Sequence, residues 1–426
     1  MGLSMKIRDW DINLKVRLFG EAMMNITYWM FFPFLTIYFA DEFGKSKAGL
    51  LLVFSQVFSV IANLMGGYCA DRFGRKRMMV LSSIGQGLSF LVFAAASSPW
   101  LHSPWTGFVS FACAGVFGSF YWPASQAMVA DVVEEKHRSN VFAIFYTAIN
   151  IAVVIGPILG AIFYAAYRVE LLIIAGIVCL LLGLILSKWT HETAPKSKSA
   201  DPDTNGKWYD FLLNQLRDYS LIVKDRTFLQ FIMAGVLAGQ TFMQLDLLFP
   251  VYIKEVLQDS SFAIGNWSLT VRGEQAFGII LAENGLLVAL LTVSVTKWMS
   301  KYYERNVFIF SSVAYAISVI MFSLTHSIWG FILSMALFTF GELMGAGLQQ
   351  SFVSKLAPEH MRGQYFAAAS LRYTISRTIA PLSIPMTVWI GYNWTFFVLF
   401  ILALLSAAMY WMMFHTFEKK NIKMQH

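Results

Sequence analysis

Residues 66–79 read GGYCADRFGRKRMM and separate two long apolar stretches of the chain. We expect Gly67 to permit close helix packing and Gly74 to permit a tight turn, because glycine lacks a Cβ atom. Asp71 would end the first helix, where it can pair with a cation or cap a neighbouring helix. With Arg75 and the basic residues beside it, the stretch predicts a short charged turn between two apolar helices.

The rest of the chain has the composition of a membrane protein. Of its 426 residues, 57% are hydrophobic and only 13% are charged, against about 25% charged in soluble domains. A bilayer crossing needs about 20 mostly apolar residues, and backbone groups in lipid must be paired within a helix. We therefore predict an all-α fold with twelve transmembrane helices, near 17–40, 47–70, 77–97, 105–130, 140–166, 169–189, 227–252, 276–297, 306–324, 328–354, 364–390 and 392–416.

The net charge of +7 is explained by topology. With the N-terminus inside, most Lys and Arg residues fall on the cytoplasmic side, as the positive-inside rule requires. Both termini are then cytoplasmic, and a multi-pass protein of a bacterial cytoplasmic membrane is expected. This distribution argues against nucleic-acid binding. The cations expected outside are Lys45, Lys47, Arg168, Lys254 and Arg272.

Polar residues divide the predicted helices into six and six. The expected domains are an N-terminal bundle at 1–190, a cytoplasmic linker at 191–226 and a C-terminal bundle at 227–426. Within the linker, 207–224 has apolar residues at helical spacing and basic ends. We expect an amphipathic helix at the membrane surface there, with a plain connector as the alternative.

The two halves carry corresponding sequence features. An offset of 224 residues relates Gln126 to Gln350 and Pro157 to Pro381. A six-plus-six repeat is typical of transporters whose substrate site lies between the halves.

The charged turn resembles the signature loop of the major facilitator superfamily. The resemblance implies a conformational latch between the halves, built from the loop and an acidic residue at the end of helix four. The alternative is that these charges only fix topology and loop shape. The residues matching the latch are Gly67, Asp71, Arg72, Gly74, Arg75 and Asp131.

A second motif resembles the antiporter motif of drug:proton exporters. Helix five contains VVIGPILGA, with Gly156, Pro157 and Gly160. Proline and glycine together favour a bend or a close helix contact. Most of the chain resembles LmrP-type multidrug exporters, through the signature loop, AMVAD, FMQLDLLFP and FTFGEL. That type carries a further carboxylate early in helix five, where this chain has Phe145, so its proton pathway must differ.

Ionisable residues inside a membrane span are costly and indicate function. Glu342 lies near mid-membrane and is the best candidate for proton coupling, followed by Asp246 in helix seven. The alternative for Glu342 is a structural pair with Arg372 in helix eleven. Glu21 and Glu283 are expected near helix ends, where they would snorkel or cap.

The sequence predicts a proton-coupled antiporter that exports lipophilic, often cationic drugs by alternating access. Protons and membrane lipids are its expected partners, and a monomer without cofactor or metal is expected. The alternative is an exporter or flippase of a lipid, glycolipid or metabolite; an enzyme is not expected, since no catalytic or nucleotide-binding motif is present. Aromatic residues can line an adaptable cation pocket, and the candidate cavity residues are Asn25, Tyr28, Phe145 and Gln244.

Overall fold

The structure is a computed structural model that describes residues 7–194, 225–257, 259–264, 267–356 and 362–425. The chain forms two compact units. Unit 1 contains residues 1–35 and 54–213, and unit 2 contains residues 36–53 and 214–426. The expected linker at 195–206 and the amphipathic helix at 207–224 lie outside the described residues.

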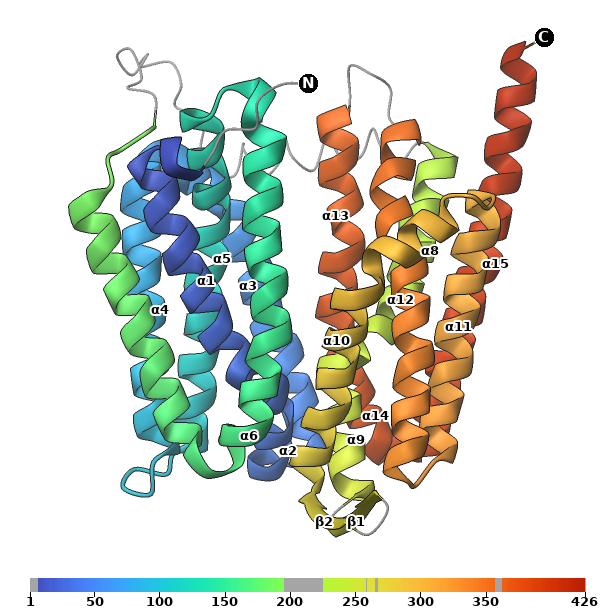
Figure 1. Cartoon of the computed structure of the whole chain (residues 1–426), viewed down its shortest axis with the longest axis horizontal. Helices are drawn as coiled ribbons and strands as arrows, with labels where there is room; N and C mark the ends of the chain where they lie inside the picture. The colour runs from blue at the N-terminus through green and yellow to red at the C-terminus, as the bar shows by residue number, and fades with distance from the viewer. Residues whose placement is uncertain (1–6, 195–224, 258, 265–266, 357–361, 426) are drawn as a thin grey trace. The chain divides into compact units, whose positions relative to one another are not determined.

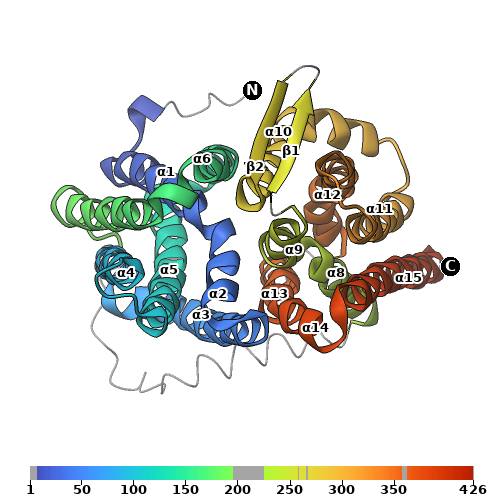
Figure 2. The same cartoon turned by 90° about the horizontal axis from the view of Figure 1, so that it is seen from below.

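Unit 1 is built from long helices (Figure 1). Helices α1 and α6 run side by side, and α4 packs against both α5 and α6 (Figure 2). Helix α6 contains two predicted spans, which join at Tyr167, where the backbone leaves helical geometry. The elements of unit 1 are η1 (Ile7–Asp9), α1 (Ile12–Phe31), η2 (Phe32–Phe34), most of α3 (Lys45–Phe73), α4 (Arg75–Ser97), α5 (Pro104–Val132) and α6 (Glu135–Trp189).

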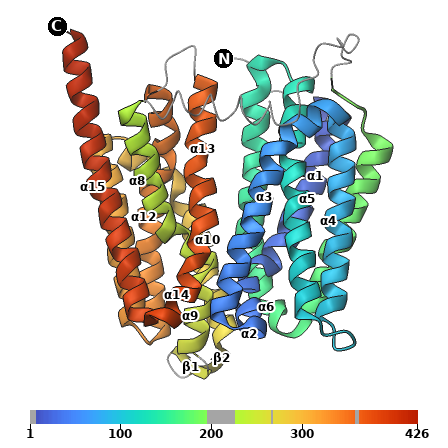
Figure 3. The same ribbon diagram turned by 180° about the vertical axis from the view of Figure 1, so that it is seen from behind.

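Unit 2 pairs α8 with α15 and α13, and α10 with α12 (Figure 3). It also includes α2 (Leu35–Phe43), apart from its first residue, and the start of α3. The remaining elements are α8 (Arg226–Phe242), η3 (Met243–Asp246), α9 (Leu248–Val256), β1 (Asp259–Ile264), β2 (Trp267–Arg272), α10 (Gly273–Met299), α11 (Glu304–Leu324), α12 (Ile328–Leu356), α13 (Arg362–Ile379), η5 (Ala380–Leu382), α14 (Ser383–Trp389) and α15 (Gly391–Gln425).

The helical membrane fold predicted from the sequence is confirmed. Among the described residues, eight helical segments are long and apolar enough to cross a membrane. One of them, Ile144–Trp189, covers two predicted spans. Three further predicted spans correspond to α1 with α2, to α5, and to α13 with α14.

Three spans are interrupted by short 3₁₀ segments. Pro33 lies in η2, between α1 and α2, and Pro381 lies in η5, between α13 and α14. In the corresponding first span of the second half, η3 separates α8 from α9. Such breaks free backbone groups within a membrane, which proteins tolerate where neighbours or a cavity can satisfy them.

One element of the fold was not expected from the sequence. Strands β1 and β2 form an antiparallel hairpin before α10, with Asp259 opposite Arg272 and Ile264 opposite Trp267. The adjacent Gly265 and Asn266 in the sequence were the available signal, because this dipeptide type favours two-residue hairpins.

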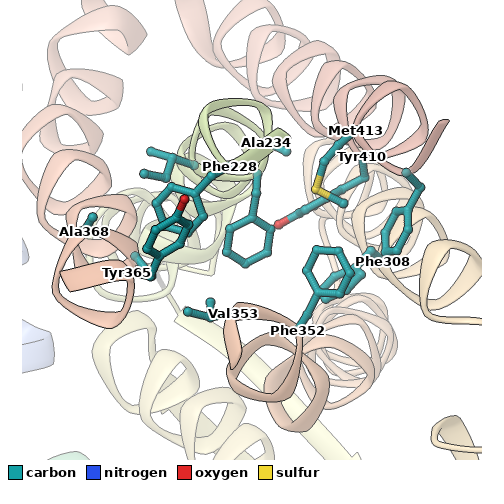
Figure 4. Packing of buried hydrophobic residues seen from close by; sticks show 13 residues of the cluster. Phe228, Ala234, Phe308, Phe352, Val353, Tyr365, Ala368, Tyr410 and Met413 are labelled. Carbon is teal, nitrogen blue, oxygen red and sulfur yellow. The ribbon is translucent and has the colours of Figure 1, made fainter. Parts of the chain in front are cut away.

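An aromatic cluster occupies the core of unit 2 (Figure 4). Phe308 stacks on Tyr410 with ring centroids 5.0 Å apart, and Phe352 contacts Phe414 at 4.8 Å. Buried aromatic pairs of this kind add about 1 kcal/mol each beyond their burial. This packing joins α8, α11, α12, α13 and α15.

Candidate functional site

Glu342 lies in the middle of α12 and faces polar groups. The Asn284 amide on α10 donates to Glu342 Oε2 at 3.2 Å and to Thr339 Oγ1 at 2.9 Å. Glu342 also interacts electrostatically with Asp246. Two helices thus bring a carboxylate, an amide and a hydroxyl together inside the bundle.

Asp246 occupies the end of the helix break η3. Its carboxylate atom Oδ1 is buried and has no hydrogen-bond partner among the described residues. Its backbone carbonyl accepts a hydrogen bond from Thr36 Oγ1 at 2.8 Å. A buried carboxylate oxygen without a donor is costly unless a proton or a cation occupies it.

The Arg372 guanidinium interacts with groups other than the Glu342 carboxylate. Its guanidinium lies 4.3 Å from the centroid of the Phe231 ring. It donates to the Ala369 carbonyl at 3.0 Å and to Gln349 Oε1 at 3.3 Å. Within the described part of unit 2, no ion pair joins Arg372 to Glu342, so the structural pair considered as the alternative is not formed in this conformation.

Glu283 was expected near a helix end, and this expectation is wrong. It lies well inside α10, next to Asn284. Its Oε2 atom is buried and lacks a partner among the described residues. The ends of a span can be predicted from the sequence only approximately. The burial of the Glu283 side chain depends on how the helices pack, which the sequence alone does not show.

Of the four residues expected to line a cavity, Asn25, Phe145 and Gln244 are buried and Tyr28 is half-buried. Gln244 is fully buried, donating to the Gln240 carbonyl at 2.6 Å and accepting from Ser383 Oγ at 2.6 Å. Asn25 donates to the Glu21 carbonyl, and Tyr28 stacks on Phe32 with centroids 4.7 Å apart. In the described conformation, Gln244 therefore serves packing. Phe145, the fourth, is described next.

Unit 1 contains a buried charge network that the sequence analysis missed. Arg17 is 1% exposed and Glu21 is 2% exposed, one helical turn apart in α1. Arg17 Nε lies 2.8 Å from Glu21 Oε1, and the guanidinium lies 4.8 Å from the centre of the Phe145 ring. Snorkelling or capping by Glu21 is therefore wrong. The available signal was the Arg–Glu spacing of four residues in an apolar helix.

The signature loop forms a compact ion-pair network within unit 1. Arg75 pairs with Asp71 and, through Nε, with Asp131 Oδ2 at 3.1 Å. Another Arg75 nitrogen donates to the Ala70 carbonyl at 3.0 Å. Arg72 instead donates to the Tyr68 hydroxyl at the surface. The structure thus brings together Asp71, Arg75 and Asp131 within unit 1, and the latch between the halves stays a prediction.

The two glycines of the loop have different roles. Gly74 has φ of +99°, so the tight turn predicted there is confirmed. The close packing expected of Gly67 is wrong, because a Cβ atom at that position would meet nothing within 4 Å. The neighbouring Gly66 makes the close contact instead, with a Cβ there lying 2.9 Å from Pro123 Cγ.

Glu192, just beyond α6, caps the helix that follows the loop. Its Oε1 atom accepts from the Lys76 amide at 3.3 Å and from the Thr193 and Ala194 amides at 3.1 Å. Burial alone would raise the pKa of Glu192, but these backbone donors outweigh it and lower the pKa below its ordinary value. A carboxylate at a helix N-terminus also interacts favourably with the helix dipole.

We expect Glu192→Gln to lower thermal stability at neutral pH but not at acid pH. A lowered folded pKa contributes stability above the unfolded pKa, about 4.3 for Glu. That contribution disappears as the pH falls through the folded pKa. Because the side chain is exposed, the expected effect is only about 0.5 kcal/mol. Melting in detergent from pH 7 downward measures it, and a constant difference at all pH values contradicts it.

The glycines of the antiporter motif lie in α6 and make a close contact with α1. A Cβ atom at Gly156 would lie 2.5 Å from Trp29 Cβ and 3.0 Å from the Ile26 carbonyl oxygen. A Cβ at Gly160 would collide with the Met30 carbonyl. Pro157 lies inside the helix. Of the two alternatives, the close contact is the one that the glycine positions show.

We expect Gly160→Ala to destabilise unit 1 by about 1–3 kcal/mol, the usual cost of overpacking. The obstructing atom is a backbone carbonyl, which cannot rotate away as a side chain can. Gly67→Ala is the matched control and should be neutral or slightly stabilising, because its added methyl meets open space. Thermal unfolding of both variants in detergent tests this, and equal melting temperatures would argue against the close contact.

A charged cluster fixes residues 36–53 to the rest of unit 2. Lys45 lies 3.0 Å from Glu255 Oε2 and over the Tyr392 ring at 4.7 Å. Lys254 pairs with Asp41 and with Glu274. Burial alone would lower the pKa of Lys254, but these two carboxylates raise it above its ordinary value. The cluster borders a cavity of about 290 Å³ lined by Ile37, Ala40, Asp41, Lys45, Val251, Lys254 and Glu255.

The fold and these intramembrane charges define a multi-pass membrane transporter. The sequence profile of the Major Facilitator Superfamily matches residues 18–381 and 263–425. The chain therefore belongs to the major facilitator superfamily, as the signature loop indicated. The expectation that it is not an enzyme is confirmed by this membership and by its relatives, which are transporters.

The chain is similar to individual transporters of this superfamily. The chain is 57% identical over 424 residues to the "Na(+), Li(+), K(+)/H(+) antiporter" of Planococcus maritimus, covering 98% of this chain and 99% of the relative. It is 21% identical to the multidrug resistance protein MdtH of Proteus mirabilis strain HI4320, covering 83% and 81%. A crystal structure of a POT family transporter in complex with a thioalcohol-conjugated peptide has a TM-score of 0.74 at 17% identity, covering 96% of both chains. That last likeness concerns the fold alone.

Proposed function

We propose that this protein is a proton-coupled antiporter that exchanges monovalent metal cations for protons. The observation that carries the proposal is the set of buried carboxylates in unit 2. Among the described residues, Asp246 Oδ1 has no hydrogen-bond partner, although the charge of Arg377 acts on this carboxylate, and Glu342 accepts a hydrogen bond from a neutral amide. The full-length similarity to a Na⁺, Li⁺, K⁺/H⁺ antiporter supports the choice of substrate.

The chemistry of the site suits small hard cations. Carboxylate and hydroxyl oxygens are among the ligands that such cations prefer. Glu342 and Thr339 supply one of each, and the Asn284 amide nitrogen donates to both. Protonation neutralises a carboxylate, and cation binding compensates its charge. Because a proton and a monovalent cation satisfy the same oxygen, they compete for it, and competition at one site is sufficient for exchange.

The proposal assigns proton coupling to Glu342 and Asp246, with Arg372 outside the exchanging site. The helix break beside Asp246 frees backbone groups close to its carboxylate. Alternating access would expose the site to each side of the membrane in turn. The predicted boundaries of 1–190, 191–226 and 227–426, and the cytoplasmic position of both termini in a bacterial plasma membrane, remain part of this proposal.

The decisive experiment uses the purified full-length protein in liposomes that contain a pH-sensitive dye. With an acidic lumen, external NaCl, LiCl or KCl should raise the lumenal pH, because entering cations drive protons out. Choline chloride is the matched control for ionic strength and should have no effect. If the alkali salts act no faster than in protein-free liposomes, the proposal is wrong.

Export of lipophilic cations is a second candidate function. It is favoured by the similarity to MdtH, a multidrug resistance protein, and by the resemblance to LmrP-type exporters. The same carboxylates would attract an organic cation. Proton-driven ethidium movement in the same liposomes tests it, and competition between ethidium and Na⁺ would indicate one shared site.

A further inference from the structure

The charge network of unit 1 is incompletely satisfied. Glu21 Oε1 receives three donors: Arg17 Nε at 2.8 Å, the Tyr121 hydroxyl at 2.9 Å and the Ser125 hydroxyl at 3.0 Å. Glu21 Oε2 and Arg17 Nη1 are buried and, among the described residues, have no partner. One oxygen of the Glu21 carboxylate therefore accepts three hydrogen bonds, and the other accepts none from the described residues.

This asymmetry distinguishes the network from a purely structural ion pair. A buried pair offsets its desolvation only when its remaining donors and acceptors are also bonded. Of the two atoms left over, Glu21 Oε2 can take up a proton, whereas Arg17 Nη1 already carries its protons. A proton on Glu21 Oε2 would give a neutral carboxyl group whose other oxygen keeps its three donors.

We propose that Glu21 is a second proton-carrying site of the antiporter, with Arg17 as its permanent counter-ion. The inference rests on the proposed function and adds a coupled proton to it. When Glu21 is ionised, the pair is neutral; when Oε2 takes up a proton, the pair carries one positive charge. The cycle then moves this proton in addition to the exchange at Glu342 and Asp246.

The described hydrogen bonds to the Glu21 carboxylate come from two helices. From its own helix, Arg17 faces it, and from α5 the hydroxyls of Tyr121 and Ser125 do. Helix α6 contributes the Phe145 ring, which stacks on Trp10 with centroids 6.0 Å apart and covers the Arg17 guanidinium. The Phe145 ring has no group that can accept a proton. Among the described residues of this network, Glu21 is the only carboxylate.

The test measures how many protons accompany each cation. In liposomes with a fixed Na⁺ gradient and the voltage held near zero by a permeant anion, net flux stops at a particular opposing pH gradient. A larger proton-to-cation ratio requires a smaller pH gradient. We expect Glu21→Gln to shift this balance point to a larger pH gradient. Glu21→Asp, which keeps a titratable group, should restore the wild-type balance.

The double variant Arg17→Gln/Glu21→Gln separates coupling from structure. It removes both charges, so it should fold even if Glu21→Gln alone leaves Arg17 uncompensated. The proposal expects the double variant to show the shifted balance point, whereas a purely structural pair predicts the wild-type one. Glu170→Gln, an exposed glutamate of unit 1, is the matched control and should leave the balance unchanged.

The outcomes separate the two proposals. If the wild type shows no cation-driven proton flux, the proposed function itself is wrong. If the wild type exchanges ions and either Glu21→Gln or the double variant keeps the wild-type balance point, only the second proton site is overturned. A shift in the folded variants, with ²²Na⁺/Na⁺ exchange retained, supports it.

Discussion

Glu342→Gln is expected to abolish cation-driven proton movement. Glutamine retains the shape of the side chain and can still bond to Asn284, but it cannot carry a proton or a negative charge. Side chains that transfer protons commonly contribute about 100-fold or more to rate. We therefore expect at least about a 100-fold loss of Na⁺-driven alkalinisation in acid-loaded liposomes.

The control for this prediction is Glu304→Gln in the same unit. Glu304 begins α11, at the end of the span, and pairs with Lys355. Its replacement should leave exchange within about twofold of wild type, as expected for a peripheral ion pair of small energy. If the Glu342 variant retains wild-type exchange while remaining folded, Glu342 does not couple protons and its contact with Asn284 is structural.

The second large effect is expected at Arg75. Arg75→Gln should slow exchange by about 10-fold, in the range of a conformational coupling of 1–3 kcal/mol, with little change in cation affinity. The guanidinium holds Asp71, Asp131 and the Ala70 carbonyl at once. Without it, Asp71 and Asp131 both lose the cation that they share. Initial rates measured over a range of Na⁺ concentrations separate turnover from affinity.

Two further variants sharpen the test of the latch. Arg75→Lys keeps the charge but lacks the planar fork, so its rate should fall between those of the wild type and the Gln variant. Arg77→Gln removes an exposed cation of the same loop and should leave turnover unchanged. If loss of Arg77 slows exchange as much as loss of Arg75, the effect reflects the overall charge of the loop and not the ion-pair network.

Much of the fold could be predicted because lipid imposes simple constraints. Apolar stretches of about 20 residues must be helices in a bilayer, and the prolines near the breaks in the first and eleventh spans were visible in the sequence. The tight turn at Gly74 was predictable because few other residues adopt its positive φ. The hairpin at 259–272 was missed because it lies in a short loop where hydropathy carries little information.

The candidate site was only partly predictable. Position within a helix identified Glu342 and Asp246, since depth in the membrane follows from the sequence. It did not reveal that Arg372 lies on the Phe231 ring instead of pairing with Glu342. The choice of partner depends on how helices rotate against one another, and apolar helices can pack on several faces with similar hydropathy.

By itself, the sequence determined the class of protein, its helical segments and the charged turn at 66–79, because each of these depends on local composition and spacing. Only the tertiary structure decided which charges meet. It placed Glu21 against Arg17, Tyr121 and Ser125, and it joined residues 36–53 to unit 2 through Lys45 and Glu255. Apart from Arg17 and Glu21, which lie one helical turn apart, these contacts link residues far apart in the chain. They form because a buried charge must find a partner wherever packing brings one within reach.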